Sequence, residues 1–97
     1  MVMAMDLWKI DLNLLVVLDV LLRTRNLTQA GRRLGRTQPA ISDALRRLRD
    51  LLGDEILVRV GQRYDLTPRA QQMREPLSRV LSSIEDALEN RPSFDPA

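Results

Sequence analysis

Apolar residues recur with helical spacing over the first half of this 97-residue chain. The segment from Leu12 to Arg23 is apolar around most of its circumference, which predicts a helix covered on several sides, with Asp11 as its N-cap. A second helix of about two turns is predicted to follow, with Thr28 as its N-cap and Gly35 as its C-terminal stop. Two consecutive short helical segments are therefore expected to begin the domain.

A third helix is predicted over residues 38–52, between Thr37 as N-cap and Gly53 as the stop. The apolar stripe that predicts it consists of Ile41, Leu45, Leu48 and Leu52. Gly31 in the second helix is small enough to let a neighbouring segment approach closely. Two short helices joined by a tight turn, the second of them basic, form a helix-turn-helix pattern.

The pattern changes from helical to extended after this third helix. Residues 55–60 are β-prone, Gly61 and Gln62 predict a turn, and residues 63–66 can return as a second strand. We therefore expect a two-stranded wing over residues 56–66. The predicted fold class is mainly α: three helices and a two-stranded wing in a winged helix-turn-helix, followed by a long helix.

A fourth helix of roughly 34 Å is predicted from Pro68 to about Asn90, with Thr67 as N-cap and a bend at Pro76. Its apolar positions alternate three and four residues apart, which is typical of a heptad seam. One interpretation is packing on its own domain, but a helix of this length would overhang it, so we favour dimerisation. The predicted dimer interface comprises Met73, Leu77, Val80, Leu81, Ile84 and Leu88.

Composition narrows the range of functions. The chain contains no Cys and no His, which removes the usual zinc and nucleophile arrangements, so we expect neither a metal site nor an enzyme. The apolar run ending at Leu22 is interrupted by Asn13 and Asp19 and is too short to span a bilayer. We interpret it as a buried helix of one small cytoplasmic domain with no membrane partner.

Positive charge is concentrated in one segment. Residues 23–49 contain eight Arg and one acidic residue, a net charge of +7, which leaves −5 for the rest of a chain whose net charge is +2. Fourteen of the fifteen basic residues are Arg, which suits bidentate contacts to phosphate or guanine. Genome composition could explain Arg in place of Lys, but it does not explain the clustering. An anionic partner is therefore expected.

Pro39 falls where a helix tolerates proline, because the first four backbone N–H groups have no partner within the helix. The N-terminal end of this helix carries the positive end of the helix dipole, which suits entry into a DNA major groove. The face opposite the apolar stripe supplies the side chains expected to lie near bases, which are Gln38, Pro39, Ser42, Asp43 and Arg46. Contacts to the DNA backbone are expected from Thr28, Gln29, Arg32, Arg33, Arg36, Thr37, Arg47, Arg59 and Arg63.

Several of these assignments have alternatives. Asp43 could accept a hydrogen bond from cytosine, pair with Arg47 four residues later, or orient Arg46 or Arg47. Arg46 could contact DNA or only be solvated, and Arg49 could reach phosphate or protein. Arg59 and Arg63 could each contact the DNA backbone or the minor groove, or neither.

Two other functions fit parts of the pattern. A helical dimer could use its basic face to dock an acidic protein as an adaptor. RNA binding is disfavoured because Trp8, Tyr64 and Phe94 are scattered and form no stacking platform.

Three motifs at fixed spacing give the chain a family resemblance. They are Leu27-Thr28-x-Ala30, Thr37-Gln38-Pro39-Ala40-x-Ser42 and Leu52-Gly53-x-x-x-Leu57-x-Arg59. Over about residues 10–90 the sequence resembles the DNA-binding half of LysR-type transcriptional regulators. The opening at residues 11–15 and the end at residues 93–96 look like the subgroup of nodulation and nitroaromatic-degradation regulators.

This resemblance implies a sequence-specific regulator that binds double-stranded promoter DNA. It implies a winged domain over residues 1–67, a linker helix over 68–90 that pairs two subunits, and the start of a hinge over 91–97. It further implies an absent effector-binding domain for a small molecule, which the subgroup suggests is aromatic, and dimers of dimers. By resemblance, Gln38, Pro39 and Ser42 match base-contact positions and Arg59 matches the wing arginine. Leu57 and Asp43 depart from the family's usual residues.

Overall fold

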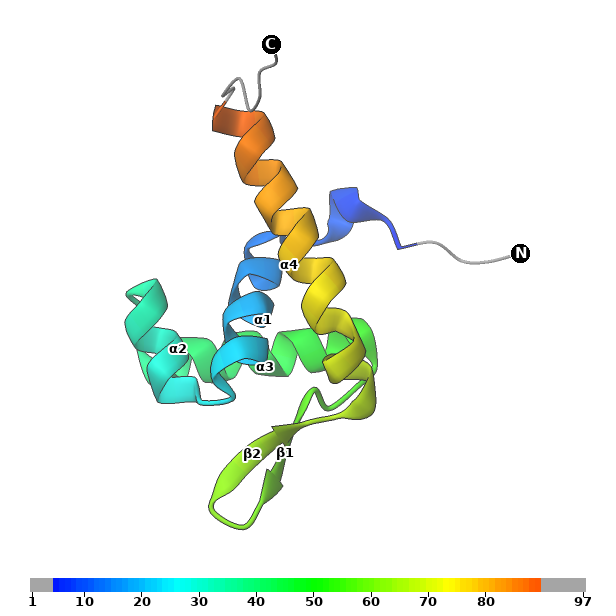
Figure 1. Cartoon of the computed structure of the whole chain (residues 1–97). Helices are drawn as coiled ribbons and strands as arrows, with labels where there is room; N and C mark the ends of the chain where they lie inside the picture. Colours follow the sequence, from blue (N-terminus) through cyan, green and yellow to red (C-terminus); the bar gives the residue numbers. More distant parts are fainter. Residues whose placement is uncertain (1–4, 90–97) are drawn as a thin grey trace, which may run out of the picture.

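The computed structural model describes residues 5–89 and is mainly helical, as predicted. The described elements are a 3-10 turn η1 (Leu7–Lys9), helices α1 (Asn13–Thr24), α2 (Leu27–Leu34), α3 (Gln38–Leu52) and α4 (Pro68–Glu89), and strands β1 (Leu57–Val60) and β2 (Arg63–Leu66). Helices α1 to α3 form a compact group, from which the wing and the far end of α4 project in opposite directions (Figure 1). The segment predicted as a hinge, 91–97, lies outside the described residues.

Helix α3 begins and ends where the sequence predicts. The Thr37 hydroxyl accepts a hydrogen bond from the Ala40 N–H at 3.2 Å, and Pro39 lies in the first turn, where its missing N–H removes no helical bond. At the other end, Gly53 adopts the left-handed conformation (φ 63°) that terminates the helix. The start of α3 is therefore determined by the Thr37 cap and by Pro39 in the first turn.

The predicted N-caps of the two earlier helices need correction. Helix α2 is capped by Asn26, whose side-chain oxygen accepts from the Gln29 N–H at 2.9 Å, whereas Thr28 lies within the first turn. Asn26 has the extended backbone that an N-cap requires, so it takes the position predicted for Thr28. In α1 the capping position is Leu12, and Asp11, one residue earlier, accepts from the Asn13 N–H.

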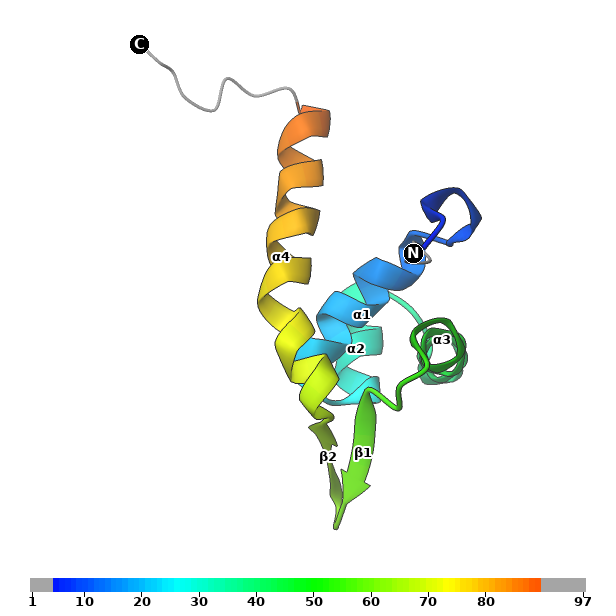
Figure 2. The same ribbon diagram turned by 90° about the vertical axis from the view of Figure 1, so that its right-hand side faces the viewer.

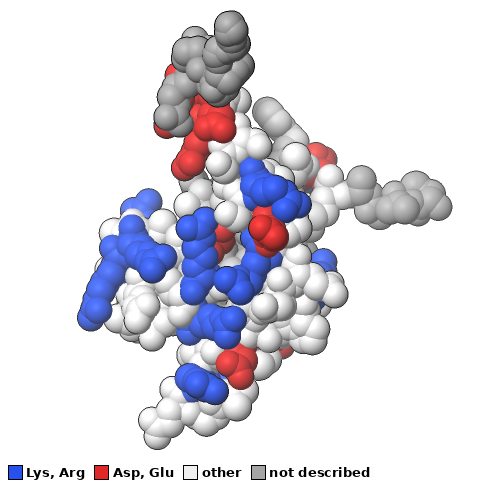
Figure 3. All heavy atoms as spheres, viewed as in Figure 1, with Lys and Arg blue, Asp and Glu red and all other residues white. Residues whose placement is uncertain are grey.

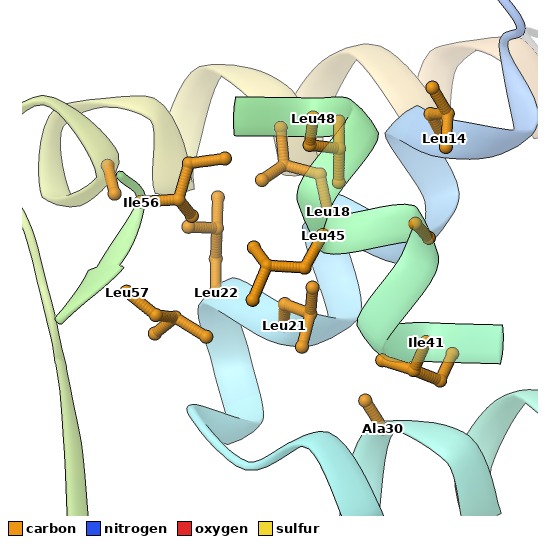
Figure 4. Close-up of a cluster of buried hydrophobic side chains, with 12 residues drawn as sticks. Leu14, Leu18, Leu21, Leu22, Ala30, Ile41, Leu45, Leu48, Ile56 and Leu57 are labelled. Carbon is orange, nitrogen blue, oxygen red and sulfur yellow. The ribbon is translucent and has the colours of Figure 1, made fainter. Parts of the chain in front are cut away.

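The core lies between α1 and α3 and is closed by the segment that leads into the wing. Figure 4 shows side chains from α1 facing those from α3, with the start of the wing at one side. The largest fully buried side chains are Leu18, Leu21, Leu22, Ile41, Leu48, Ile56 and Leu57. Leu52, predicted as part of the buried stripe, is only half-buried. The close approach at Gly31 is made by the turn before α3 rather than by a neighbouring helix, since a Cβ there would lie 2.6 Å from the Arg36 carbonyl oxygen.

The wing is an antiparallel pair in which Leu57 lies opposite Leu66 and Val60 opposite Arg63. Strand β1 begins at Leu57, two residues later than predicted, because Glu55 and Ile56 form the connection from α3 instead. Ile56 is fully buried and has a left-handed backbone (φ 68°), a conformation that is costly for a β-branched residue. Burial of its side chain in the core therefore holds a strained backbone at the base of the wing.

Hydrogen bonds at this base join α3, the wing and α4. The Asp54 carboxylate accepts from the Thr67 hydroxyl at 2.6 Å and from the Ile56 N–H at 2.8 Å. Thr67 in turn accepts from the Ala70 N–H at 3.1 Å, which confirms it as the cap of α4, and Arg69 donates to the Leu52 carbonyl. The bond from Thr67, and then the one from Ile56, lowers the pKa of Asp54 below its ordinary value.

Helix α4 has an inner half (68–78) against the domain and an outer half (79–89) that extends beyond it (Figure 2). Ala70 is fully buried, and Met73 and Leu77 pack against the core, so these two predicted interface residues contact their own domain. Along the outer half, Val80, Ile84 and Leu88 are 52%, 44% and 80% exposed. The helix continues through Pro76.

Candidate nucleic-acid interface

The surface of α3 divides into an apolar face and a polar face along its whole length. Its buried residues are Ile41, Ala44, Leu45 and Leu48. All five side chains predicted to lie near bases are exposed, namely Gln38, Pro39, Ser42, Asp43 and Arg46. They occupy the first nine residues of the helix, which is the part that helix-turn-helix proteins place against base edges. The structure therefore brings the whole predicted set together on one accessible face.

Asp43 pairs with Arg46 rather than with Arg47, the i, i+4 partner considered from the sequence. One carboxylate oxygen of Asp43 accepts a hydrogen bond from an Nη of Arg46, and the two side chains remain 52% and 66% exposed. This hydrogen bond, together with the charge of Asp43, raises the pKa of Arg46 above its ordinary value. Arg46 is thus held in the middle of the exposed face as part of an ion pair.

The other two arginines of this helix contact protein. Arg47 lies 3.8 Å from the Asp11 carboxylate, which precedes α1. Arg49 donates to the carbonyl oxygens of Glu55 and Leu57, at 2.8 and 2.9 Å. Arg49 therefore has the protein-contact role of the two considered from the sequence, and its hydrogen bonds join α3 to the wing.

A cleft of about 210 Å³ lies between the start of α2, the start of α3 and the wing. Its lining residues are Arg25, Asn26, Leu27, Thr28, Gln38, Arg59, Gln62, Arg63 and Tyr64. Arg59 lies over the Tyr64 ring, 5.7 Å from its centroid, and donates to the Gly61 carbonyl at 3.3 Å. The structure thus gathers Thr28, Gln38, Arg59 and Arg63, which are widely separated in the sequence, around one basic cleft.

Arg25 belongs to this cleft, although the sequence analysis did not select it. Its backbone is left-handed (φ 53°), and it ends α1 with a bond from its N–H to the Leu21 carbonyl. A cation at the C-terminal end of a helix is explained by the helix dipole without any ligand. Its place beside the wing depends on the chain reversal between α1 and α2, and no local pattern predicts that.

The remaining predicted backbone contacts are on α2 and in the turn after it. Gln29, Arg32, Arg33 and Arg36 are exposed, as is Thr37. In Figure 3 basic side chains lie over α2 and across the middle of the domain up to α4, with a few acidic ones among them, and further acidic side chains gather toward the outer end of α4. The charge separation seen in the sequence is therefore partly kept in space, with basic side chains over α2 and acidic ones at the outer end of α4.

Two features are missing from residues 5–89. No helix there is long and apolar enough to cross a membrane. The same residues contain no group of three or more side chains suited to hold a metal ion.

Residues 12–71 match the lysR family of bacterial regulatory helix-turn-helix proteins. The transcriptional activator NagR of a Ralstonia species is 47% identical over 92 residues, which are 95% of this chain and 31% of NagR. Nodulation protein D 1 of a Bradyrhizobium species (strain NC92) is 44% identical over 88 residues, 91% of this chain and 28% of that protein. The chain thus spans about a third of the length of these relatives, and its resemblance to the nodulation regulators is confirmed.

Two solved structures share the fold. A probable transcriptional regulator of Pseudomonas aeruginosa superimposes with a TM-score of 0.79 at 40% identity, covering 94% of this chain and 31% of that one. The DNA-binding domain of BenM, solved with catB site 1 DNA, gives a TM-score of 0.74 at 21% identity, covering 82% and 86% of the two chains. The match over most of the chain and the agreement in fold establish the family: this chain belongs to the lysR family of bacterial regulatory helix-turn-helix proteins, and it has the winged-helix fold of their DNA-binding domains.

Proposed function

We propose that this chain binds double-stranded promoter DNA sequence-specifically, with α3 in the major groove and the wing near the backbone or the minor groove. The observation that carries the proposal is the exposed polar face at the start of α3, with its opposite face fully committed to the core. Gln38 can pair with adenine, Arg46 with guanine, and Pro39 can touch a thymine methyl group. Ser42 and Asp43 complete the base-reading face.

The basic cleft and the exposed side chains of α2 are suited to the DNA backbone. Thr28, Arg59 and Arg63 line the cleft, and Gln29, Arg32, Arg33, Arg36 and Thr37 are exposed on α2 and in the turn after it. Arg25 joins this set on the same grounds. Arg47 remains half-exposed at 48% and its distance to Asp11 is long, so it can turn toward a phosphate. Several Arg–phosphate contacts around the base-reading helix would fix its orientation on the duplex.

The outer half of α4 supports a homodimer. Its apolar side chains Val80, Ile84 and Leu88 face solvent, and an apolar groove of about 440 Å³ runs beside the inner half. Met73, Leu77 and Leu81 extend this surface toward the domain. A second copy of the helix would cover the seam without the added cost of ordering the backbone, because the helix is already formed.

The division of the whole protein is part of the same proposal. Residues 1–67 form the DNA-binding unit, 68–90 the dimerisation helix and 91–97 the start of a hinge. The relatives are about three times as long as this chain. We therefore propose that the whole protein also contains a domain that binds a small-molecule effector, of which an aromatic compound is one candidate. We further propose that the whole protein forms tetramers. It acts in the cytoplasm and lies on the nucleoid when bound.

Selection of bound sequences from a random duplex pool, together with the salt dependence of affinity, tests the DNA proposal. Several phosphate contacts predict that log K falls steeply and linearly with log salt. A flat dependence with no enriched sequence would contradict the proposal and favour an adaptor that docks an acidic protein.

Arg46→Ala should weaken the enriched site by about 1–3 kcal/mol and relax at least the base position that Arg46 contacts. Arg79→Ala, on the outer half of α4, removes the same charge away from α3 and should leave that preference unchanged. Equal weakening of all sequences by Arg46→Ala would instead identify Arg46 as a phosphate contact.

A further inference from the structure

The Asp43–Arg46 pair is an unusual component for a DNA-binding face. It is exposed, lies between the proposed reading positions and carries no net charge. A lone carboxylate beside a polyanion would reduce affinity, and an arginine neutralised by an acid adds little attraction to phosphate. The pair therefore contributes little to sequence-independent binding, and its position suits it to base recognition.

The hydrogen-bonding capacity of the pair is only partly used. A guanidinium has five N–H donors, and the bond to Asp43 uses one Nη of Arg46, so an edge remains for a bidentate contact to guanine O6 and N7. The carboxylate of Asp43 uses one oxygen for Arg46, and its second oxygen can accept from the amino group of cytosine. Both side chains can thus contact bases without breaking the bond between them.

The spacing of the pair fits neighbouring base pairs. Residues three apart on a helix are separated by about 4.5 Å along its axis, close to the roughly 3.4 Å step between stacked bases. Asp43 also holds the long arginine side chain in place before DNA arrives, which reduces the entropy lost when it binds.

We infer that Asp43 and Arg46 form one recognition unit, in which Arg46 reads guanine and Asp43 reads cytosine on an adjacent base pair. This inference rests on the proposed DNA-binding function. It assigns Asp43 a direct base contact in addition to its contact with Arg46. It also predicts that the two positions are read jointly, so that neither is retained when one member of the pair is removed.

Sequence selection with the 97-residue chain and its variants tests the inference. Asp43→Ala and Arg46→Ala should each flatten the same two adjacent positions, with discrimination falling about tenfold or more, and the double variant should discriminate no worse than either single one. Asp50→Ala removes the same charge from the same helix, outside the proposed reading set, and should retain both preferences. All substituted side chains are exposed, so folding should persist.

Asp43→Asn sharpens the test because an amide pairs with adenine. It should exchange cytosine for adenine at one position, while the guanine preference weakens with loss of the charged partner. The inference is overturned if Asp43→Ala leaves the selected sequences unchanged, or alters only the guanine position, since Asp43 would then merely orient Arg46. If the original chain enriches no sequence at all, the proposed function itself fails, and the inference fails with it.

Discussion

The two halves of α4 have the same kind of sequence and opposite surroundings. Both halves repeat apolar residues every three or four positions, yet Ala70 is fully buried in the inner half and Leu88 is 80% exposed in the outer half. The inner half packs on α1 and the core, whereas the outer half extends past the domain (Figures 1 and 2). Spacing thus identifies an apolar stripe, but what covers that stripe depends on how far the rest of the domain reaches.

The same substitution in both halves should give the largest contrast. Ala70→Asp places a carboxylate in the core without a partner and should lower the free energy of unfolding by about 3 kcal/mol or more, independently of protein concentration. Ala87→Asp makes the same substitution on an exposed surface and should change the unfolding of the monomer by under about 1 kcal/mol. Urea unfolding at several protein concentrations measures both, and equal effects would remove the distinction between the halves.

A charge on the outer seam should break association without unfolding the domain. Ile84→Glu places a carboxylate on the proposed dimer surface and should raise the dissociation constant about tenfold or more. Ser82→Glu adds the same charge on the opposite side of the helix and serves as the control. Sedimentation over a range of concentrations reports the mass; an unchanged mass for Ile84→Glu would contradict a dimer through this helix.

Loss of the N-cap of α2 should have a smaller effect on stability, and that effect arises in the helix-turn-helix rather than in the outer half of α4. Asn26→Ala removes the side-chain acceptor at the start of α2 and should destabilise the domain by about 1 kcal/mol. Thr28→Ala, at the position predicted from sequence, should change stability by under about 0.5 kcal/mol. Thermal unfolding of the two variants side by side tests this order, and a larger loss for Thr28→Ala would restore the original assignment.

Replacement of Asp54, at the junction between the domain and α4, should have the weakest effect on stability, and that effect should be visible only in acid. Because the folded pKa of Asp54 lies below its ordinary value, its contribution to stability is complete above about pH 4 and is lost as pH falls through the folded pKa. Asp54→Asn should therefore flatten the acid limb of stability against pH, measured by urea midpoints. Identical slopes for Asp54→Asn and the unaltered chain would refute the assignment.

Local signals predicted most of the fold and the main candidate site. Threonine, proline and glycine at the ends of α3 determine its limits, and its apolar stripe determines which side faces outward. Where two capping residues lie close together, as Asn26 and Thr28 do, local preference cannot choose between them. The choice is made by where the chain leaves α1, since Asn26 follows directly on the left-handed Arg25.

The unpredicted part consists of contacts between distant segments. Arg47 lies toward Asp11, 36 residues earlier in the chain. Arg49 reaches carbonyls beyond the end of α3, and Arg25 meets the wing across the domain. In each case the sequence indicated a charged surface residue, and only the tertiary arrangement determined its partner.

The hydrogen bonds at the base of the wing connect the direction of α4 to that of the proposed DNA-binding surface. Arg69 donates to the Leu52 carbonyl at the end of α3, Thr67 donates to Asp54, and Arg49 donates to the Leu57 carbonyl in the wing. In the proposed dimer, the angle at which two copies of this 22-residue helix cross would therefore help to set the distance and orientation between the two proposed DNA-binding surfaces.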